Sequence, residues 1–210
     1  MTLVYLLRHG ATAANRCAPY RLQGRGTDLP LDAVGQAQSL RAAEALAGRG
    51  VQAVYCSPLL RARQTAAAIA GHAGLAAVAV PELTEADIGS WEGLTWDEVR
   101  ARDPDRLARF LAAPGTEPYP GGESFLDAQR RVAPVLEALA SAHPDGRIAV
   151  VGHNITNRAY LALLLGLPID RARALRQANG GINVLHLAGP DAHVITLNAA
   201  LHLDGLKTAE

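Results

Sequence analysis

Arginine and histidine side chains recur after short apolar runs at three places that are far apart in this chain. Such runs are typical of strands that are buried on both faces of a parallel sheet. Since the carboxyl ends of parallel strands meet at one edge of the sheet, the side chains that follow them are expected to lie close together. The members of this set are Arg8 and His9 after residues 3–7, Arg61 after residues 51–56, and His153 after residues 148–151.

Two arginines and two histidines at one rim would repel one another unless an anion lies between them. The planar guanidinium fork matches the oxygens of a phosphate group, and a neutral histidine nitrogen is a competent nucleophile near pH 7. Each residue alone has a simpler interpretation. A lone histidine is usually a hydrogen-bonded structural group, and an arginine at a helix start, such as Arg61, is usually solvated. The four together indicate a phosphate site.

Strands alternate with helices along the chain, which predicts an α/β fold, a three-layer sandwich with a mostly parallel central sheet and helices on both faces. Asp32 and Ser57 are expected helix N-caps, with Pro58 in the first turn, and Pro134 predicts a kink or break. The long loop over residues 10–32 is expected to be functional. We expect strands at residues 3–7, 51–56, 76–80, 148–151, 183–187 and 193–197, and helices within 31–50, 58–70, 95–112, 124–143 and 154–165.

Length and composition favour a single globular domain over residues 1–210. The formal net charge is zero, so the chain lacks the basic footprint of a nucleic-acid-binding protein. No apolar stretch is long enough for a transmembrane helix, and Cys17 and Cys56 do not make a disulfide framework. These features predict a cytoplasmic enzyme.

The segments around the arginines and histidines resemble the signature of the histidine phosphatase superfamily, which also contains the cofactor-dependent phosphoglycerate mutases. The resemblance covers nearly the whole chain in the expected order and implies a phosphoglycerate mutase-like fold. The first motif reads Leu-Arg-His-Gly-Ala-Thr. The matching segments are residues 7–12 with Asn15, 23–24, 28–31, 56–66, 83–85, 89–93, 119–124, 151–153, 179–185, 197–198 and 202–203.

The resemblance implies a metal-independent phosphomonoesterase that hydrolyses a small phosphorylated metabolite through a phosphohistidine on His9. Arg8, Arg61 and His153 are implied to hold the phosphoryl oxygens and stabilise the transition state. Glu85 is implied as the general acid for the leaving alcohol and then as the base for water. A carboxylic acid donates at pH 7 only if its neutral form is favoured, so we expect Glu85 in a pocket with few charge partners.

Further phosphate-binding positions are implied beside these catalytic residues. They are the neutral donors Asn15 and Gln23, with Gly24 next to Gln23, and Asn154 next to His153. No metal and no cofactor are expected, because the arginines supply the positive charge and the chain has no zinc motif or phosphate-binding glycine loop. The expected partner is a small phosphate ester, without nucleic acid or membrane, and a homodimer is an open alternative to a monomer.

Two departures from the family pattern bear on substrate choice. Asn154 stands where the family commonly has glycine, and its side chain is a candidate to enter the pocket. The stretch over residues 16–22 is longer than in many relatives and is expected to bring Arg16, Tyr20 and Arg21 near the pocket mouth.

Two alternative functions share the same residues. A phosphoglycerate mutase would use His9 in the same way but keep the phosphoryl group. Mutases usually carry a glutamate in the first motif, where this chain has Ala11 and Thr12, and a larger insertion before the second histidine. A non-catalytic relative that only binds phosphorylated ligands would lack His9, an arginine or Glu85, and all are present.

Two assignments within the acid segment and its surroundings also stay open. Glu82 and Glu92 are alternatives to Glu85 as the acid. Trp91 and Trp96 are interpreted as packing residues beneath the site, with a substrate platform as the alternative.

Overall fold

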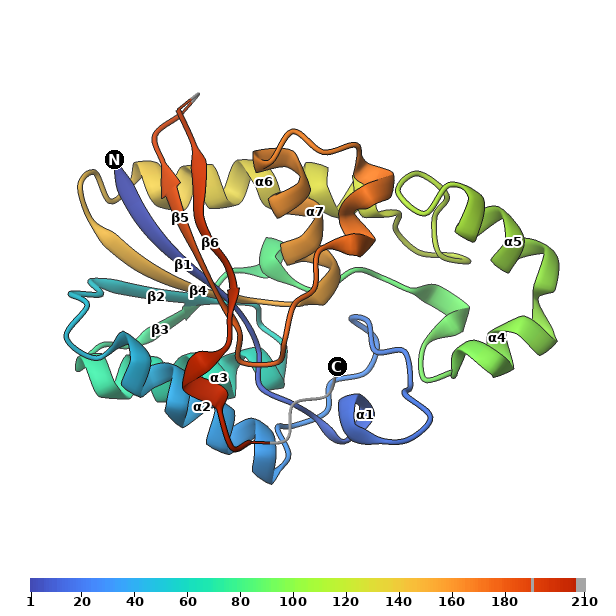
Figure 1. Ribbon diagram of the computed structural model, residues 1–210, viewed down its shortest axis with the longest axis horizontal. Helices are drawn as coiled ribbons and strands as arrows, with labels where there is room; N and C mark the ends of the chain where they lie inside the picture. The colour runs from blue at the N-terminus through green and yellow to red at the C-terminus, as the bar shows by residue number, and fades with distance from the viewer. Residues whose placement is uncertain (190, 207–210) are drawn as a thin grey trace.

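The computed structural model describes residues 1–189 and 191–206, and at its centre is a six-stranded sheet (Figure 1). The strand order is β3-β2-β4-β1-β5-β6. The first four strands in this order run parallel, and β5 and β6 are antiparallel to their neighbours. The sheet is therefore mostly parallel, as predicted. The strands are β1 (Thr2–Arg8), β2 (Ala53–Cys56), β3 (Ala77–Ala79), β4 (Arg147–Gly152), β5 (Ile182–Leu187) and β6 (His193–Ala199).

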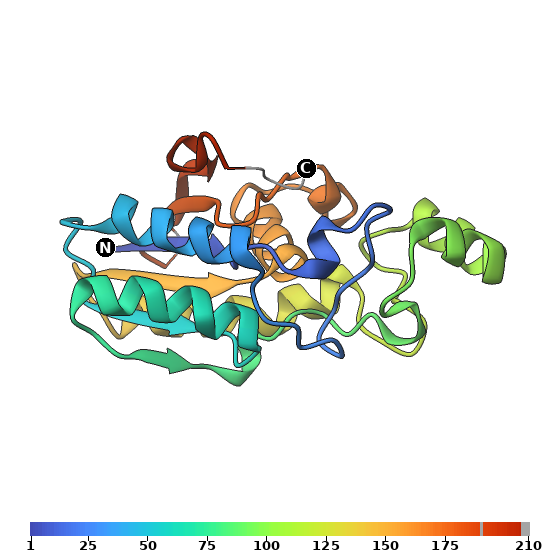
Figure 2. The same ribbon diagram turned by 90° about the horizontal axis from the view of Figure 1, so that it is seen from below.

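Alternate side chains of β1 face the two helical layers, because successive residues of a strand point to opposite faces. Tyr5 and Leu7 pack with α2 and α3, whereas Val4 and Leu6 pack with α6 and α7. Burial of each such side chain contributes on the order of 1.5–3 kcal/mol. Figure 2 shows the pair α2 and α3 on one side of the sheet and the other pair behind it, which confirms the three-layer α/β sandwich. These helices are α2 (Ala33–Leu46), α3 (Leu60–Ala73), α6 (Phe125–Ser141) and α7 (Asn154–Leu164).

A pair of short helices lies beyond the carboxyl ends of the strands (Figure 1). They are α4 (Trp96–Arg102) and α5 (Pro104–Ala112), and Pro104 begins the second of them. Aromatic side chains pack together beneath α4 and α5. The ring centroids of Phe110 and Tyr119 lie 4.7 Å apart, and those of Trp91 and Phe110 lie 5.3 Å apart. Offset and edge-to-face aromatic contacts of this kind are favourable. These contacts therefore hold α4 and α5 in place beyond the carboxyl ends of the strands.

Helix ends and interruptions differ from the sequence predictions at two places. The helix expected from Pro58 with Ser57 as its N-cap begins at Leu60 with Leu59 as its N-cap, and the N–H of Leu60 donates to Asp28 Oδ1 of the long loop at 2.7 Å. Pro134 does not break α6, which runs on through its position. Asp32 caps α2 as predicted, accepting from Gly35 N at 2.8 Å. None of the helices in the described ranges has the length and apolar character needed to cross a membrane.

Candidate active site

His9 lies directly after β1, at the carboxyl edge of the sheet, and is almost completely buried. Its Nδ1 lies 2.7 Å from the carbonyl oxygen of Gly10, and its Nε2 lies 3.2 Å from the Nε–H of Arg61. A carbonyl requires a donor and an N–H requires an acceptor, so the proton is on Nδ1 and the lone pair on Nε2. Burial, and then the charges of Arg61 and Arg8, hold the pKa of His9 well below its ordinary value. His9 is therefore neutral at pH 7, with Nε2 in the nucleophilic form.

His153 follows β4 and lies against His9, with the two ring centroids 5.0 Å apart at 60°. It is fully buried, and neither of its ring nitrogens has a hydrogen-bond partner among the described residues. Burial and then the charge of Arg61 hold its pKa well below the ordinary value. Buried polar groups are normally hydrogen-bonded. His153 therefore has unused hydrogen-bonding capacity beside His9.

Arg61 is fully buried in the first turn of α3 and is held by the long loop. Its Nη1 donates to the carbonyl of Thr27 at 2.8 Å, and its Nη2 donates to that of Gly24 at 2.9 Å. The N–H of Gly24 in turn donates to Glu92 Oε1 at 2.8 Å. Gly24 was expected to bind phosphate, but its polar groups are engaged with Arg61 and Glu92. We assign it the positioning of Arg61 instead.

Arg8 is the second arginine of the predicted site, and it lines the cavity described below. Its Nη1 donates to the carbonyl of Gln177 at 2.6 Å, while its Nε is buried without a partner among the described residues. Burial lowers its pKa from the ordinary value, although neighbouring Tyr20 and Glu85 act in the other direction. Arginine keeps its charge at neutral pH in proteins. Arg8 therefore directs a positive charge at the same space as His9.

Asn15 and Gln23 meet through the hydroxyl of Thr12 on the long loop. Thr12 Oγ1 lies 2.9 Å from Gln23 Oε1 and 3.2 Å from Asn15 Oδ1. Asn15 Oδ1 also accepts from Asn179 Nδ2 at 3.2 Å. The oxygen of Asn15 is engaged in this way, and both residues line the cavity. The NH2 group of Gln23 lies 3.4 Å from the carbonyl of Thr27, and a role of either amide in phosphate binding stays a prediction.

Glu85 is buried beside the first turn of α7 and accepts four backbone N–H groups. Oε2 accepts from Asn154 at 2.9 Å and Ile155 at 3.1 Å, and Oε1 accepts from Thr156 at 3.2 Å and Ala86 at 3.0 Å. Arg8 and Arg158 line the same cavity as Glu85, so the expectation of a pocket with few charge partners is wrong. The N–H of Asn154, expected at the phosphate, is engaged by Glu85, while its side chain lines the cavity.

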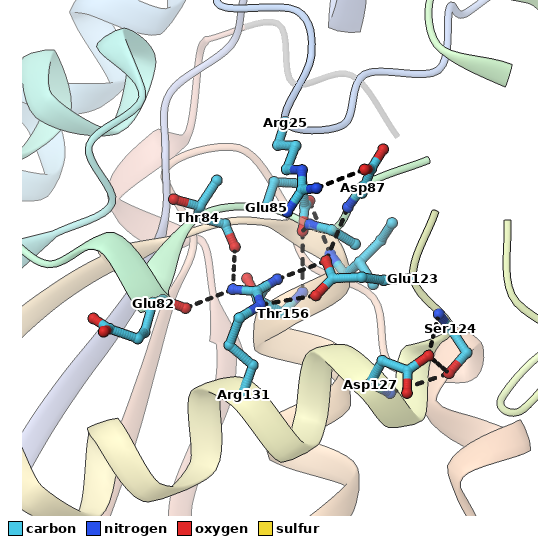
Figure 3. A network of polar contacts seen from close by, with 12 residues as sticks. Arg25, Glu82, Thr84, Glu85, Asp87, Glu123, Ser124, Asp127, Arg131 and Thr156 are labelled. Carbon is cyan, nitrogen blue, oxygen red and sulfur yellow. Dashed lines mark hydrogen bonds and ion pairs between the residues drawn. The ribbon is translucent and has the colours of Figure 1, made fainter. Parts of the chain in front are cut away.

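Arg131 of α6 anchors the segment that carries Glu85 (Figure 3). Its guanidinium forms a bidentate ion pair with Glu123, at 2.9 and 2.8 Å, and also donates to the carbonyls of Glu82 and Thr84. Both carbonyls lie just before Glu85 in the sequence, so the contacts fix the backbone on its amino-terminal side. Sequence reasoning missed Arg131, because it lies in the interior of a helix and in none of the matched motifs.

A cavity of about 480 Å³ opens over His9 at the carboxyl ends of the strands. Tyr20 and Trp96 line it, whereas Arg16 is paired with Asp32 and Arg21 with Glu98. Of the three residues expected at the mouth from residues 16–22, only Tyr20 is therefore a lining residue. The other lining side chains include Arg8, Asn15, Leu22, Gln23, Glu85, Ile88, Tyr119, Phe125, Asn154, Ile155, Arg158, Arg173 and Arg176.

Glu82 and Glu92, the alternatives to Glu85 as the acid, have different surroundings from Glu85, and so do the two tryptophans from each other. The side chain of Glu82 is exposed, and that of Glu92 accepts from the N–H groups of Gly24 and Gly26. Trp91 is buried in the aromatic cluster, whereas Trp96 forms part of the cavity wall. In the part of the chain that the structure describes, no group of three or more His, Cys, Asp or Glu side chains is arranged to hold a metal ion.

Comparison with known proteins identifies the class that this fold and site define. The model of the histidine phosphatase superfamily (branch 1) matches residues 4–200, and the chain belongs to this superfamily. The family resemblance noted in the sequence is thereby confirmed.

Two curated relatives and one solved structure illustrate the similarity. Phosphoserine phosphatase 1 of Hydrogenobacter thermophilus is 29% identical over 203 residues, covering 97% of this chain and 95% of that protein. The metal-independent phosphoserine phosphatase of Arabidopsis thaliana is 36% identical over 192 residues, covering 89% and 77%. The structure of Bacillus stearothermophilus YhfR superimposes with a TM-score of 0.89 at 27% identity, covering 97% of this chain and 100% of that one. The predicted phosphoglycerate mutase-like fold is confirmed.

Proposed function

We propose that this chain is a metal-independent phosphomonoesterase that hydrolyses a small phosphorylated metabolite through a phosphohistidine on His9. The observation that carries the proposal is the tautomer of His9. The carbonyl of Gly10 holds the proton on Nδ1, and Nε2 keeps its lone pair at the floor of the cavity. The membership of the histidine phosphatase superfamily and the names of the phosphatase relatives support the same reaction class.

The proposed reaction has two displacements at phosphorus. In the first, the lone pair of His9 Nε2 forms the P–N bond, the P–O ester bond breaks, and the leaving oxygen takes a proton from Glu85. In the second, a water oxygen attacks phosphorus, Glu85 takes its proton, and the P–N bond breaks to restore neutral His9. The products are the alcohol and inorganic phosphate. Positioning and charge stabilisation supply most of the catalysis in phosphoryl transfer.

The charge that builds up on the phosphoryl oxygens is proposed to be balanced by protein groups alone. Arg8 lines the cavity with His9, and the Nε–H of Arg61 donates to His9 Nε2 at 3.2 Å. When Nε2 bonds to phosphorus, this N–H is released to a phosphoryl oxygen. His153 supplies a hydrogen bond from a ring that has no protein partner among the described residues. Charge-assisted hydrogen bonds of this kind are roughly twice as strong as neutral ones. No metal or cofactor takes part in the proposed steps.

The proton that Glu85 passes to the leaving oxygen has to be supplied before the first step. The substrate can supply it, because the second ionisation of a phosphate monoester lies near pH 6. The helix end that binds Glu85 then stabilises the carboxylate that forms when its proton passes to the leaving alcohol.

The test of this proposal is turnover of p-nitrophenyl phosphate in the presence of EDTA, together with trapping of the phosphoenzyme. We expect turnover without added metal and an acid-labile, alkali-stable phosphoprotein that His9→Ala abolishes together with activity, since no P–N bond can form. Loss of activity on chelation with recovery on adding a divalent ion would contradict the metal-free mechanism. A mutase would instead retain the phosphoryl group and respond to bisphosphoglycerate.

The substrate, the cellular location and the oligomeric state also need to be considered. The cavity volume of about 480 Å³ suits a small phosphate ester. A cytoplasmic location stays part of the proposal, and a homodimer stays an open alternative to a monomer. Cell fractionation and analytical ultracentrifugation test them.

A further inference from the structure

The mouth of the cavity carries more positive charge than one phosphoryl group needs. Besides Arg8, three arginines line it: Arg158, Arg173 and Arg176. Glu85 is the one carboxylate in the described lining, although Lys+Arg and Asp+Glu are equal in number over the chain as a whole. Clefts lined by one sign of charge concentrate ligands of the opposite sign. The local excess therefore requires an explanation of its own.

Arg158 lies on α7 and is oriented by the protein. Its Nε donates to the carbonyl of Leu175 at 2.6 Å, and its two terminal NH2 groups have no hydrogen bond to the described residues. Burial, and next the charge of Arg8, lower the pKa of Arg158 to about 10, so it remains protonated at neutral pH. A half-buried arginine that is held at Nε presents its terminal fork to the cavity without a protein partner.

Arg173 lies on the 3-10 helix Ile169–Ala174. This helix ends directly before Leu175, whose carbonyl accepts the hydrogen bond from Arg158. Its guanidinium carbon is 5.6 Å from the ring centroid of Trp96 and 5.4 Å from that of Phe110. Stacking on aromatic faces orients an arginine and leaves its N–H groups free at the edge. Within the described residues, Arg158, Arg173 and Arg176 take part in none of the ion pairs.

We propose that Arg158 and Arg173 form a second anion subsite, which binds an anionic group on the alcohol portion of the substrate. Arg176, which is exposed at the rim, adds charge to this subsite. The inference rests on the proposed phosphatase function and narrows its substrate class to small phosphate esters with a second anionic group, a carboxylate or a phosphate. Arg8 and Arg61 hold the transferred phosphoryl group, while Arg158 and Arg173 hold the other end of the molecule.

A matched set of substrates tests this inference. The set is propyl phosphate, whose alcohol portion is neutral, 3-phosphooxypropanoate, which adds a carboxylate, and propane-1,3-diyl bisphosphate, which adds a phosphate. We expect kcat/KM for at least one of the two anionic esters to exceed that for propyl phosphate by roughly ten- to hundred-fold, as a charged hydrogen bond allows. The ester with the larger ratio identifies the second group as carboxylate or phosphate.

Substitutions assign the preference to residues. Arg158→Gln and Arg173→Gln are expected to reduce the preference ratio roughly ten-fold each, and Arg158→Lys, which keeps the charge, to recover part of it. Arg171→Gln is the matched control, because Arg171 lies on the same 3-10 helix but is exposed and outside the cavity lining. The preference ratio is insensitive to partial unfolding, because loss of active protein lowers turnover of every ester equally.

The outcomes separate the subsite from the reaction. Wild-type protein that hydrolyses all three esters with equal kcat/KM would overturn the subsite alone. Equal losses on the neutral and anionic esters in Arg158→Gln and Arg173→Gln would also overturn it. Wild-type protein that hydrolyses none of these esters and no p-nitrophenyl phosphate would overturn the proposed function and the subsite with it.

Discussion

Glu85 has surroundings that bear directly on the proposed proton transfers. Both of its oxygens accept backbone N–H groups, three of them from the first turn of α7. A glutamine at this position would turn an NH2 group toward N–H donors, so it is a poorer mimic of the carboxylate than it would be in an open pocket. A test of the acid role must therefore separate proton donation from damage to the site.

The dependence on the leaving group makes that separation. Glu85→Gln is expected to lower kcat/KM for an alkyl phosphate by roughly 10²–10⁴-fold, since an alkoxide needs a proton to leave. The loss should be much smaller for p-nitrophenyl phosphate, whose leaving group needs little help. Steady-state kinetics on both substrates measure the difference.

Glu82→Gln is the control for this prediction, because the Glu82 side chain is exposed in the same segment. Glu82→Gln should leave kcat/KM nearly unchanged for both the alkyl phosphate and p-nitrophenyl phosphate. Equal losses on the two substrates in Glu85→Gln would remove Glu85 from the role of acid.

At the scale of the elements, the segment that carries Glu85 depends on α6 for its place. Arg131 joins that helix to the carbonyls of Glu82 and Thr84 and to the carboxylate of Glu123. Glu123 Oε2 also accepts from Asp87 N at 2.9 Å, so contacts lie on both sides of Glu85 (Figure 3). We therefore expect Arg131 to act as a positioning residue for Glu85.

Removal of Arg131 should weaken proton donation while leaving the nucleophile in place. Arg131→Gln is expected to lower kcat/KM for an alkyl phosphate by about ten- to hundred-fold, since small displacements of a catalytic group are costly. The loss on p-nitrophenyl phosphate should be smaller, as for Glu85→Gln. The double variant that combines Arg131→Gln with Glu85→Gln should lose less kcat/KM than the product of the two single fold-losses, because both substitutions act on proton donation by Glu85.

Arg130 provides a matched control on the same helix. Its side chain is exposed and takes no part in this network, so Arg130→Gln should leave both substrates unaffected. Independent, multiplicative losses in the Arg131 and Glu85 double variant would show that Arg131 does not act through Glu85.

At the scale of the whole molecule, the folded state holds two neutral histidines in its interior. His9 and His153 are 3% and 0% exposed, and both have a pKa well below the ordinary value, first because of burial and then because of Arg61. In the unfolded chain each would titrate near its reference value of about 6.5. Below that pH the unfolded state therefore binds more protons than the folded state.

Folding stability should consequently fall as the pH is lowered below about 6.5 and continue to fall toward the depressed pKa values of the folded state. The two histidines together contribute a slope of up to about 2.7 kcal/mol per pH unit in that range. Urea unfolding at pH 7.5, 6.5 and 5.5 measures it. His153→Gln should reduce the slope, whereas the exposed His72→Gln should not. A slope unchanged by His153→Gln would mean that His153 is charged in the folded state.

The sequence by itself determined the layers of the fold and the principal residues of the site. Apolar runs such as residues 3–7 are local signals, and the alternation of strand and helix leaves few topologies to consider. Parallel strands bring their carboxyl ends to one edge, which is why the sequence alone was enough to place Arg8, His9 and His153 together. The order of the motifs indicated the superfamily in the same way.

Only the tertiary structure decided which hydrogen bonds each polar group makes. The N–H of Gly24 is used by Glu92, 68 positions away, and that of Asn154 by Glu85, 69 positions away, so neither is free for phosphate. The free fork of Arg158 likewise depends on the fold, since it results from a carbonyl on another element and from the lack of an ion-pair partner among the described residues. A backbone N–H or a guanidinium has many potential partners in the sequence, and its partner is chosen by the packing of distant elements rather than by local propensity.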